Sequence, residues 1–400
     1  MNEVIYVVLL VVGLIAAIDV AQNGNKSNDG GIAEWIPVGL FLVWLYGFLL
    51  GVFQGNPTEA VFRNFAGMSC YPIYYVFRQL RFTAMDLVKL LLMAGGLNIL
   101  VAFVMHYSIG ARDVVLIHDS IEEFLFENRR FYAQNFVTYL PVIGFLAGVL
   151  LVAPRAQILP SWLHRFARSP LLLVIMMGFS VYVAIILTLS KGIILSVLVL
   201  AALIFALSFA HKSYPSHRNF APRFFFLTIT GLILVSAMFS TRYWELISKS
   251  FSVDGAGNAI RYEQADVLLD NIRWFGWGLG AAVGSGGYAR DALGYGFELS
   301  FLNVIHKFGV LSLFVFYTYI HAFAGIVRHF ARGREYFVGC VALGGLLFLI
   351  PAIGNPTLFS PVSVLLHCSL IYLVSDRHWS VARPAASPQA LRPKVRFRPA

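Results

Sequence analysis

The chain has 400 residues, of which 58% are hydrophobic and only 12% are charged. A soluble globular domain carries about 25% charged residues, so this composition excludes an ordinary soluble protein. The apolar residues form continuous runs, whereas a membrane-spanning strand alternates apolar and polar residues, and a porin-like barrel is therefore excluded as well. We predict an all-α polytopic membrane protein.

Ten apolar runs approach the length of about 20 residues that a helix needs to cross the bilayer. We predict spans at residues 4–20, 32–53, 87–106, 135–153, 171–189, 192–210, 224–240, 299–320, 336–353 and 359–375. The run 61–80 is ambiguous, because Arg63 and Arg78 interrupt its ends and Pro72 interrupts its middle. It is either an eleventh, short span or a helix at the membrane surface. We expect roughly 10–12 transmembrane helices in one domain over residues 1–375.

The charges between the spans predict the orientation of the chain, since loops rich in Lys and Arg remain in the cytoplasm. The basic segments are 154–170, 211–223, 328–335 and the tail 376–400. Loop 107–134 has three basic residues against five acids, and loop 241–297 has five against six. We therefore expect a cytoplasmic C-terminus and an external loop 241–297, which is periplasmic in a Gram-negative cell.

Two further expectations follow from the charges. The tail 376–400 is basic, rich in Pro and Ala and without apolar periodicity, so we expect it to be disordered. Orientation explains most of the net charge of +10, and the basic segments would rest on membrane lipids rather than bind nucleic acid. The N-terminus is external if 61–80 spans and cytoplasmic if it lies on the inner surface, which its arginines favour.

Lys191 stands in the short turn Thr188-Leu189-Ser190-Lys191-Gly192 between two full spans. By the predicted orientation this turn faces outside, so its cation departs from the usual charge distribution of membrane proteins. Charges at the membrane are costly and indicate a functional site by default. The alternative is a lysine that anchors the turn at the lipid headgroups.

Loop 241–297 is a 57-residue polar stretch, and it concentrates the residues that could carry chemistry. Its arginines are Arg242, Arg261, Arg273 and Arg290. Apolar residues at helical spacing predict an amphipathic helix over 258–272. Arg261 lies near the start of that helix, where the helix dipole disfavours a cation, and this favours a role beyond helix stability. The alternative is a salt bridge to Glu263 or Asp266.

The glycine-rich run 276–287 resembles a nucleotide-binding fingerprint only superficially, because no strand precedes it and it lies between membrane spans. We interpret it as a flexible, close-packed re-entry segment, with Trp274 and Trp277 at the membrane interface. The sequence contains no metal-binding motif.

Glu298 opens the next predicted span and would place a carboxylate at the external membrane surface, where it could act as a general base. From position alone the better interpretation is a first-turn glutamate that the helix dipole stabilises. Asn303, His306 and Lys307 continue the helix inward, with Asn303 and His306 broadly on the side of Glu298. His306 is predicted to be a hydrogen-bonded core residue rather than a proton carrier.

Taken in order, these motifs resemble the O-antigen polymerase and O-antigen ligase superfamily. TLSKG at 188–192 is similar to the family's T-x-S-[RK]-G turn, and Arg261 followed by FGWGLG at 275–280 is similar to its arginine followed by P-x-x-G-x-G. ELSFLNVIHKFGVLSLFVFY at 298–317 is similar to its span opened by a polar residue. The family's proline is absent, and Glu298 stands where ligases typically carry His, which favours a polymerase.

The resemblance implies an inner-membrane enzyme that joins oligosaccharides carried on polyprenyl diphosphate into O-antigen, exopolysaccharide or capsule, without a metal or cofactor. Lys191 and Arg261 would neutralise the departing diphosphate, and Glu298 would accept the proton of the attacking sugar hydroxyl. The residues that would bind the substrate are Arg242, Arg273, Arg290, Asn303 and His306. The resemblance also suggests two protein partners, a chain-length regulator and a flippase. The alternatives are an O-antigen ligase, or a lipid-linked glycan transporter, against which the charge-poor spans argue.

Overall fold

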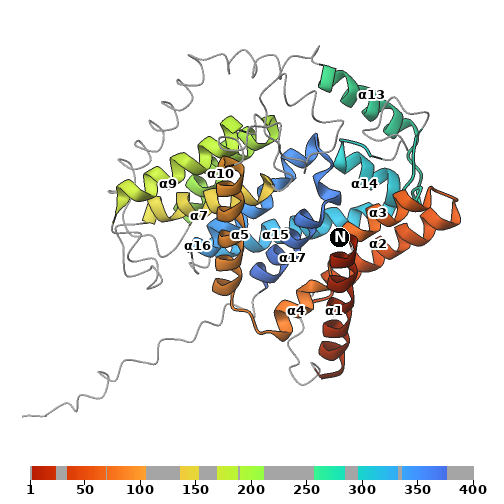
Figure 1. The fold of residues 1–400 in the computed structure, drawn as a ribbon, viewed down its shortest axis with the longest axis horizontal. Helices are drawn as coiled ribbons and strands as arrows, with labels where there is room; N and C mark the ends of the chain where they lie inside the picture. Colours follow the sequence, from red (N-terminus) through yellow and green to blue (C-terminus); the bar gives the residue numbers. More distant parts are fainter. Residues whose placement is uncertain are drawn as a thin grey trace, which may run out of the picture.

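The computed structural model describes residues 2–23, 34–68, 70–104, 136–152, 169–187, 190–210, 256–283, 296–331 and 336–375. These residues form helices and connecting turns and contain no strand, as Figure 1 shows, so the predicted all-α class is confirmed for this part of the chain. The predicted span 224–240, loop 107–134 and the tail 376–400 lie outside the described residues.

Helices occur at nine of the ten runs predicted as spans. Most bounds lie close to the predicted ones, but the helix of the run 299–320 continues to Ala331, and the α-helix of the run 336–353 ends at Leu346. They are α1 (Asn2–Asn23), α2 (Ile36–Phe53), α5 (Ala84–Val104), α7 (Tyr139–Val152), α9 (Pro170–Tyr182), α10 (Lys191–Ala210), α14 (Ser300–Phe308) with α15 (Ser312–Ala331), α16 (Tyr336–Leu346) and α17 (Pro361–Val374). Four helical stretches in the described part are long and apolar enough to cross a membrane, namely Ile36–Phe53, Ala84–Val104, Ser300–Ala331 and Tyr336–Ile353. The chain therefore has the helices of a membrane protein.

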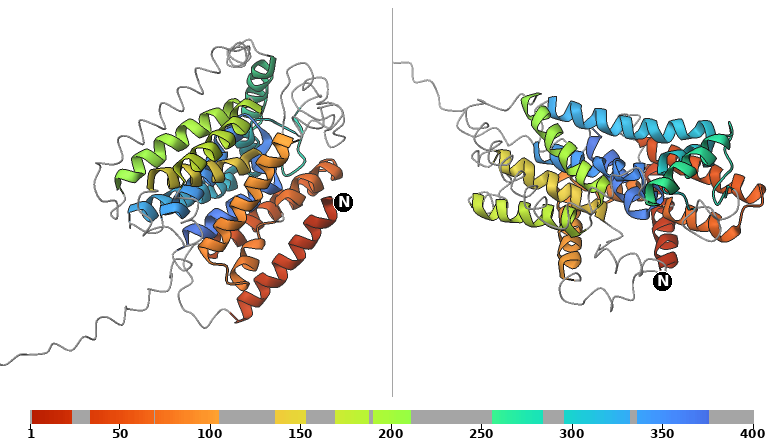
Figure 2. Two further views of the ribbon diagram at one scale, coloured as in Figure 1. Left: turned by 60° about the vertical axis from the view of Figure 1, so that its left-hand side comes forward. Right: turned by 90° about the horizontal axis from the view of Figure 1, so that it is seen from above.

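The helix α16 forms the centre of the bundle, and all of its residues are buried. Glycines allow its closest contact, because a Cβ atom on Gly144 of α7 would collide with the Cys340 carbonyl, and one on Gly344 with the Leu140 carbonyl. Small residues of this kind let membrane helices approach backbone to backbone. Figure 2 shows α9 and α10 at one edge of the bundle and α1 at the opposite edge.

The ambiguous run 61–80 is two short helices, α3 (Thr58–Met68) and α4 (Ile73–Gln79), separated by a turn at Pro72. The segment starts just after the end of α2, and Arg78 at its far end pairs with Glu34 at the start of α2, with 3.0 Å between Nη1 and Oε2. It therefore returns along the length of α2 as a broken helix, because proline cannot continue a helix without a kink.

Loop 241–297 contributes the helix α13 (Ala256–Asp270), which confirms the amphipathic helix predicted over 258–272. Gln264 and Leu268 on one side of α13 are buried, whereas Glu263, Asp266 and Asp270 on the other side are exposed. Figure 1 shows α13 at the rim of the bundle beside α14. The helix is thus held against the membrane helices through one face.

The glycine run after α13 packs tightly between α14 and α2. Gly276, Gly278 and Gly280 all have positive φ, with values of 74°, 78° and 71°, a region in which residues with a Cβ atom are strained. Trp277 N–H donates to the His306 carbonyl over 3.0 Å, and Leu279 N–H donates to the Gly47 carbonyl over 2.7 Å. Close packing is therefore observed over residues 276–283, the described part of the run, while the flexibility predicted for the run stays a prediction.

Candidate functional site

The first part of the site is the start of α10, where Lys191 is the first helical residue. Gly192 follows it and lies against Pro351, and a Cβ atom at this position would be 2.6 Å from the Pro351 Cα. Only glycine allows this approach without a shift of the backbone. The close approach of Gly192 thus places Lys191 beside the turn that contains Pro351.

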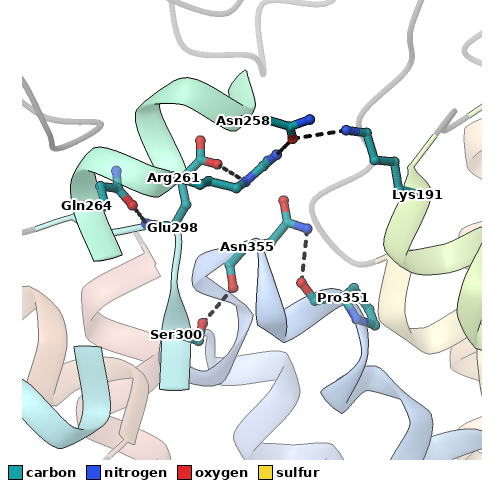
Figure 3. Close-up of polar contacts among 8 residues, drawn as sticks. All are labelled: Lys191, Asn258, Arg261, Gln264, Glu298, Ser300, Pro351 and Asn355. Atoms are coloured by element: carbon teal, nitrogen blue, oxygen red, sulfur yellow. Dashed lines mark hydrogen bonds and ion pairs between the residues drawn. The ribbon is translucent and has the colours of Figure 1, made fainter. Parts of the chain in front are cut away.

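The second part of the site is Arg261, whose guanidinium makes two contacts. Its Nε lies 2.8 Å from Oε2 of Glu298, and its Nη1 donates to the amide oxygen of Asn258 over 3.2 Å. Lys191 Nζ donates to the same Asn258 oxygen over 3.1 Å. Figure 3 shows the four side chains converging, with Lys191 from α10 on one side and Asn258 and Arg261 from α13 on the other. We call Lys191, Asn258, Arg261 and Glu298 the charged cluster.

The three residues predicted to be catalytic are therefore brought together from three separate segments of the chain. The salt bridge considered for Arg261 with Glu263 or Asp266 is not the one observed, because the guanidinium turns toward Glu298. The contact is a close ion pair rather than a well-aligned hydrogen bond. It lies in a partly dry environment, with 29% of the Arg261 side chain and 12% of the Glu298 side chain exposed.

Glu298 does not act as a helix cap. The helix α14 begins at Ser300, and Leu299 occupies the capping position without a side-chain hydrogen bond. The Glu298 backbone N–H donates to Oε1 of the buried Gln264 over 2.9 Å. Two residues of α13, Arg261 and Gln264, therefore hold Glu298 by its carboxylate and its backbone.

A turn between α16 and α17 forms the floor of the charged cluster. A Cβ atom on Gly354 would lie 3.2 Å from Nε of Arg261, so the backbone of this turn reaches the guanidinium. Asn355 Nδ2 donates to the Pro351 carbonyl over 3.0 Å, and the Ser300 hydroxyl donates to the Asn355 carbonyl over 2.5 Å. These hydrogen bonds, drawn in Figure 3, fix the turn between the starts of α10 and α14.

Sequence reasoning missed Asn258, Gln264, Gly354 and Asn355. Asn258 and Gln264 stand three residues before and three after Arg261, a spacing that places all three side chains on one helix face. That spacing was a usable signal. The turn with Gly354 and Asn355 gave no such signal, because its proximity to α13 depends on the packing of helices that are far apart in the sequence.

Three other predicted residues form a separate group around the glycine run. The Arg273 guanidinium carbon lies 3.2 Å from the centre of the Trp277 ring, and that ring stacks on His306 with centroids 6.2 Å apart. Asn303 is buried and stands about one helical turn before His306 on α14. None of the described contacts joins this group to the charged cluster, and the predicted residues Arg242 and Arg290 lie outside the described part.

His306 lies in the core, as predicted, but the hydrogen bonding expected of it is not observed. Within the described residues neither of its ring nitrogens has a hydrogen-bond partner, and the same holds for the Asn303 side-chain oxygen. The neighbouring Lys307 is fully buried, donates from Nζ to the Asn64 side-chain oxygen over 2.6 Å, and lies 5.0 Å from the centre of the Phe359 ring. The buried face of α14 therefore carries several polar side chains.

Among the residues that the structure describes, no group of three or more His, Cys, Asp or Glu side chains is arranged to hold a metal ion. Comparisons of the chain with protein-family models, with curated proteins and with solved structures found no match. The function therefore has to be argued from the site and from the motifs themselves.

Proposed function

We propose that the protein is a polysaccharide polymerase of the bacterial inner membrane that joins oligosaccharide units carried on polyprenyl diphosphate. One observation carries this proposal: Lys191, Arg261 and Glu298, three ionisable residues from separate segments, meet at the ends of apolar helices. The order of their motifs, which resembles that of the O-antigen polymerase and ligase superfamily, supports the same function.

The two cations suit a diphosphate leaving group. Guanidinium and ammonium groups bind phosphate oxygens through charge-assisted hydrogen bonds. Lys191 and Arg261 are held close together, since both donate to the same oxygen of Asn258. Placed this way, they would stabilise the negative charge that grows on the diphosphate as its bond to the sugar breaks.

Glu298 suits the role of general base. In the proposed reaction the acceptor hydroxyl oxygen attacks the anomeric carbon of the donor and forms the new glycosidic bond. The bond from that carbon to the diphosphate oxygen breaks, its electron pair leaves with the polyprenyl diphosphate, and the configuration at the carbon inverts. Glu298 takes the hydroxyl proton. Because the Glu298 carboxylate is paired with Arg261, a donor diphosphate that binds the guanidinium would release the carboxylate for this task.

The proposed orientation places the charged cluster on the periplasmic side and the basic C-terminus in the cytoplasm. The path of 58–79 along α2 favours the alternative in which this segment spans, and the N-terminus is then external. The helix α1 agrees with this, because Asp19 near its end accepts a hydrogen bond from Gln79 over 3.2 Å and Gly13 lies beside Pro72.

The test is polymer length in bacteria that lack the native gene and carry single variants. We expect Arg261→Ala, Lys191→Ala and Glu298→Gln to lose long-chain polymer while the protein still accumulates in the membrane. Matched controls change the same residue types at exposed positions: Arg63→Ala, Lys89→Ala and Glu263→Gln, which should keep normal chain lengths. Normal chain lengths in both Arg261→Ala and Glu298→Gln would contradict the proposal.

An O-antigen ligase could use the same charged cluster, and the phenotype of the loss separates the two activities. Loss of a polymerase leaves single repeat units on the lipid carrier, whereas loss of a ligase leaves finished polymer there. Glu298 in place of a histidine favours the polymerase.

A second candidate function is a lipid-linked glycan transporter, and the buried polar face of α14 favours it. Lys307 is fully buried there with Asn64, and charged groups at membrane depth often mark a transport path. Movement of a labelled lipid-linked oligosaccharide across vesicles by purified protein, without a covalent product, would identify this function.

A further inference from the structure

Asn258 occupies a central place in the charged cluster. Its single amide oxygen accepts one hydrogen bond from Lys191 Nζ over 3.1 Å and another from Arg261 Nη1 over 3.2 Å. The two donors come from α10 and α13, which are far apart in the sequence (Figure 3). Asn258 thereby fixes how far apart the two cations lie.

The chemical nature of this acceptor is informative. Two neighbouring cations are most simply bridged by a carboxylate, which gives charge-assisted hydrogen bonds that are roughly twice as strong as neutral ones. An amide instead holds both cations and adds no negative charge of its own. With Lys191, Arg261 and Glu298 ionised, the cluster keeps a formal charge of about +1, whereas an aspartate at this position would bring it to zero. The amide thus holds the cations without reducing their attraction for an anion.

We propose that Asn258 is a positioning residue for the donor diphosphate, which holds Lys191 and Arg261 so that one phosphate oxygen can accept from both, and which adds no negative charge to the cluster. This inference rests on the proposed function, because it assumes that the two cations receive a diphosphate. The Asn258 amide oxygen lies where a phosphate oxygen would accept from both cations, so the bound donor replaces it as their common acceptor.

A positioning role and a purely structural role of Asn258 predict different effects of Asn258→Asp. The two side chains have nearly the same shape, so a tether between α10 and α13 would survive the change and gain charge-assisted hydrogen bonds. A diphosphate, in contrast, would meet a carboxylate at the point where it must bind. Like charges about 4 Å apart repel strongly enough, even close to water, to weaken binding by about ten-fold or more.

The experiment measures the binding of farnesyl diphosphate to the full-length protein in detergent, together with the thermal unfolding midpoint of each variant. We expect Asn258→Asp to unfold at or above the wild-type midpoint and to bind farnesyl diphosphate at least ten-fold more weakly. Asn258→Leu, which has similar size and no acceptor, should unfold at a lower temperature and lose less affinity than the aspartate variant. In the polymerisation assay Asn258→Asp should raise KM for the lipid-linked donor far more than it lowers kcat.

Asn271→Asp is the charge control. Asn271 follows α13, about 15 Å along the helix from Arg261, and its side chain donates to the Val267 carbonyl. The same added charge at that distance should leave farnesyl diphosphate binding within two-fold of wild type.

The outcomes separate this inference from the proposed function. Equal binding by wild type and Asn258→Asp would overturn the positioning role and leave the proposed function standing. A thermal unfolding midpoint for Asn258→Asp below that of Asn258→Leu would also overturn the positioning role, because a carboxylate between two cations should stabilise their contact. If wild-type protein binds no farnesyl diphosphate at all, the proposed function fails, and the inference fails with it.

Discussion

The substitution Gly278→Ala tests whether the glycine run needs glycine to pack against α2 and α14. Gly278 has a φ of 78°, and an added Cβ atom would lie 2.5 Å from Gly51 Cα and 2.8 Å from the Leu50 carbonyl carbon. Those neighbours are backbone atoms of α2, so they cannot move aside as the end of a flexible side chain would. The run or the helix must therefore shift.

The expected cost has three parts. The left-handed backbone conformation costs an alanine about 1–2 kcal/mol. Overpacking against fixed atoms adds about 1–3 kcal/mol. A shift of the run also weakens the hydrogen bond from Leu279 N–H to the Gly47 carbonyl, worth about 1 kcal/mol. Together these terms predict that Gly278→Ala lowers the free energy of unfolding by about 3–6 kcal/mol.

Two other glycines of the same chain are matched controls. Gly55 also has positive φ, 73°, but a Cβ atom there would meet nothing within 4 Å, so Gly55→Ala should cost only the conformational term of about 1 kcal/mol. Gly96 lies within α5 with equally open space, and Gly96→Ala should be neutral or stabilising by up to about 1 kcal/mol. The measurement is thermal unfolding of the three purified variants in detergent. Equal midpoints for Gly278→Ala and Gly55→Ala would refute the packing argument.

Three further predictions address the site and its surroundings. Arg261→Lys should reduce polymerisation about 10- to 100-fold, because one ammonium cannot reproduce the forked contacts with Glu298 and Asn258, and full activity would refute this. Asn64→Leu should lower the free energy of unfolding by about 1.5–3 kcal/mol, because it removes the side-chain oxygen that accepts a 2.6 Å hydrogen bond from Nζ of buried Lys307. Unchanged stability in urea or on heating would count against that contact. Trp274 is 80% exposed, and we expect it to contact lipid. Lipids with brominated acyl chains should then quench the tryptophan fluorescence of the wild type more than that of Trp274→Phe. Equal quenching of the two proteins would exclude this contact.

The sequence allowed the helices to be predicted well, because long apolar runs have few other stable arrangements in a membrane. The helix α13 was also predictable, since its apolar residues recur at helical spacing. One break was harder to predict. The interruption between α14 and α15 at Gly309–Leu311 lies inside a run whose hydropathy is continuous, and hydropathy alone does not locate a kink. The break in the run 61–80 was signalled by Pro72.

Three residues of the charged cluster were predicted from the sequence, but the contacts between them were not. Lys191 stood out as a charge at the membrane, Arg261 as a cation near the start of a helix, and Glu298 through the resemblance of its motif to a known family. That Arg261 pairs with Glu298 rather than with an acid of its own helix depends on the packing of α13 on α14. The spacing of Asn258 from Arg261 could have placed it on the same helix face, but nothing in the sequence shows that it also meets Lys191 from a different helix.

Whether the charged cluster makes a glycosidic bond, as proposed, can be measured in a reconstituted reaction. Purified protein in liposomes would be supplied with a polyprenyl-diphosphate-linked repeat unit, and the products would be separated by length. We expect a ladder of longer lipid-linked glycans and equimolar release of polyprenyl diphosphate by the wild type and by Glu263→Gln, with neither product from Arg261→Ala or Glu298→Gln. Movement of the lipid across the bilayer without a new bond, or a normal ladder from Glu298→Gln, would contradict it.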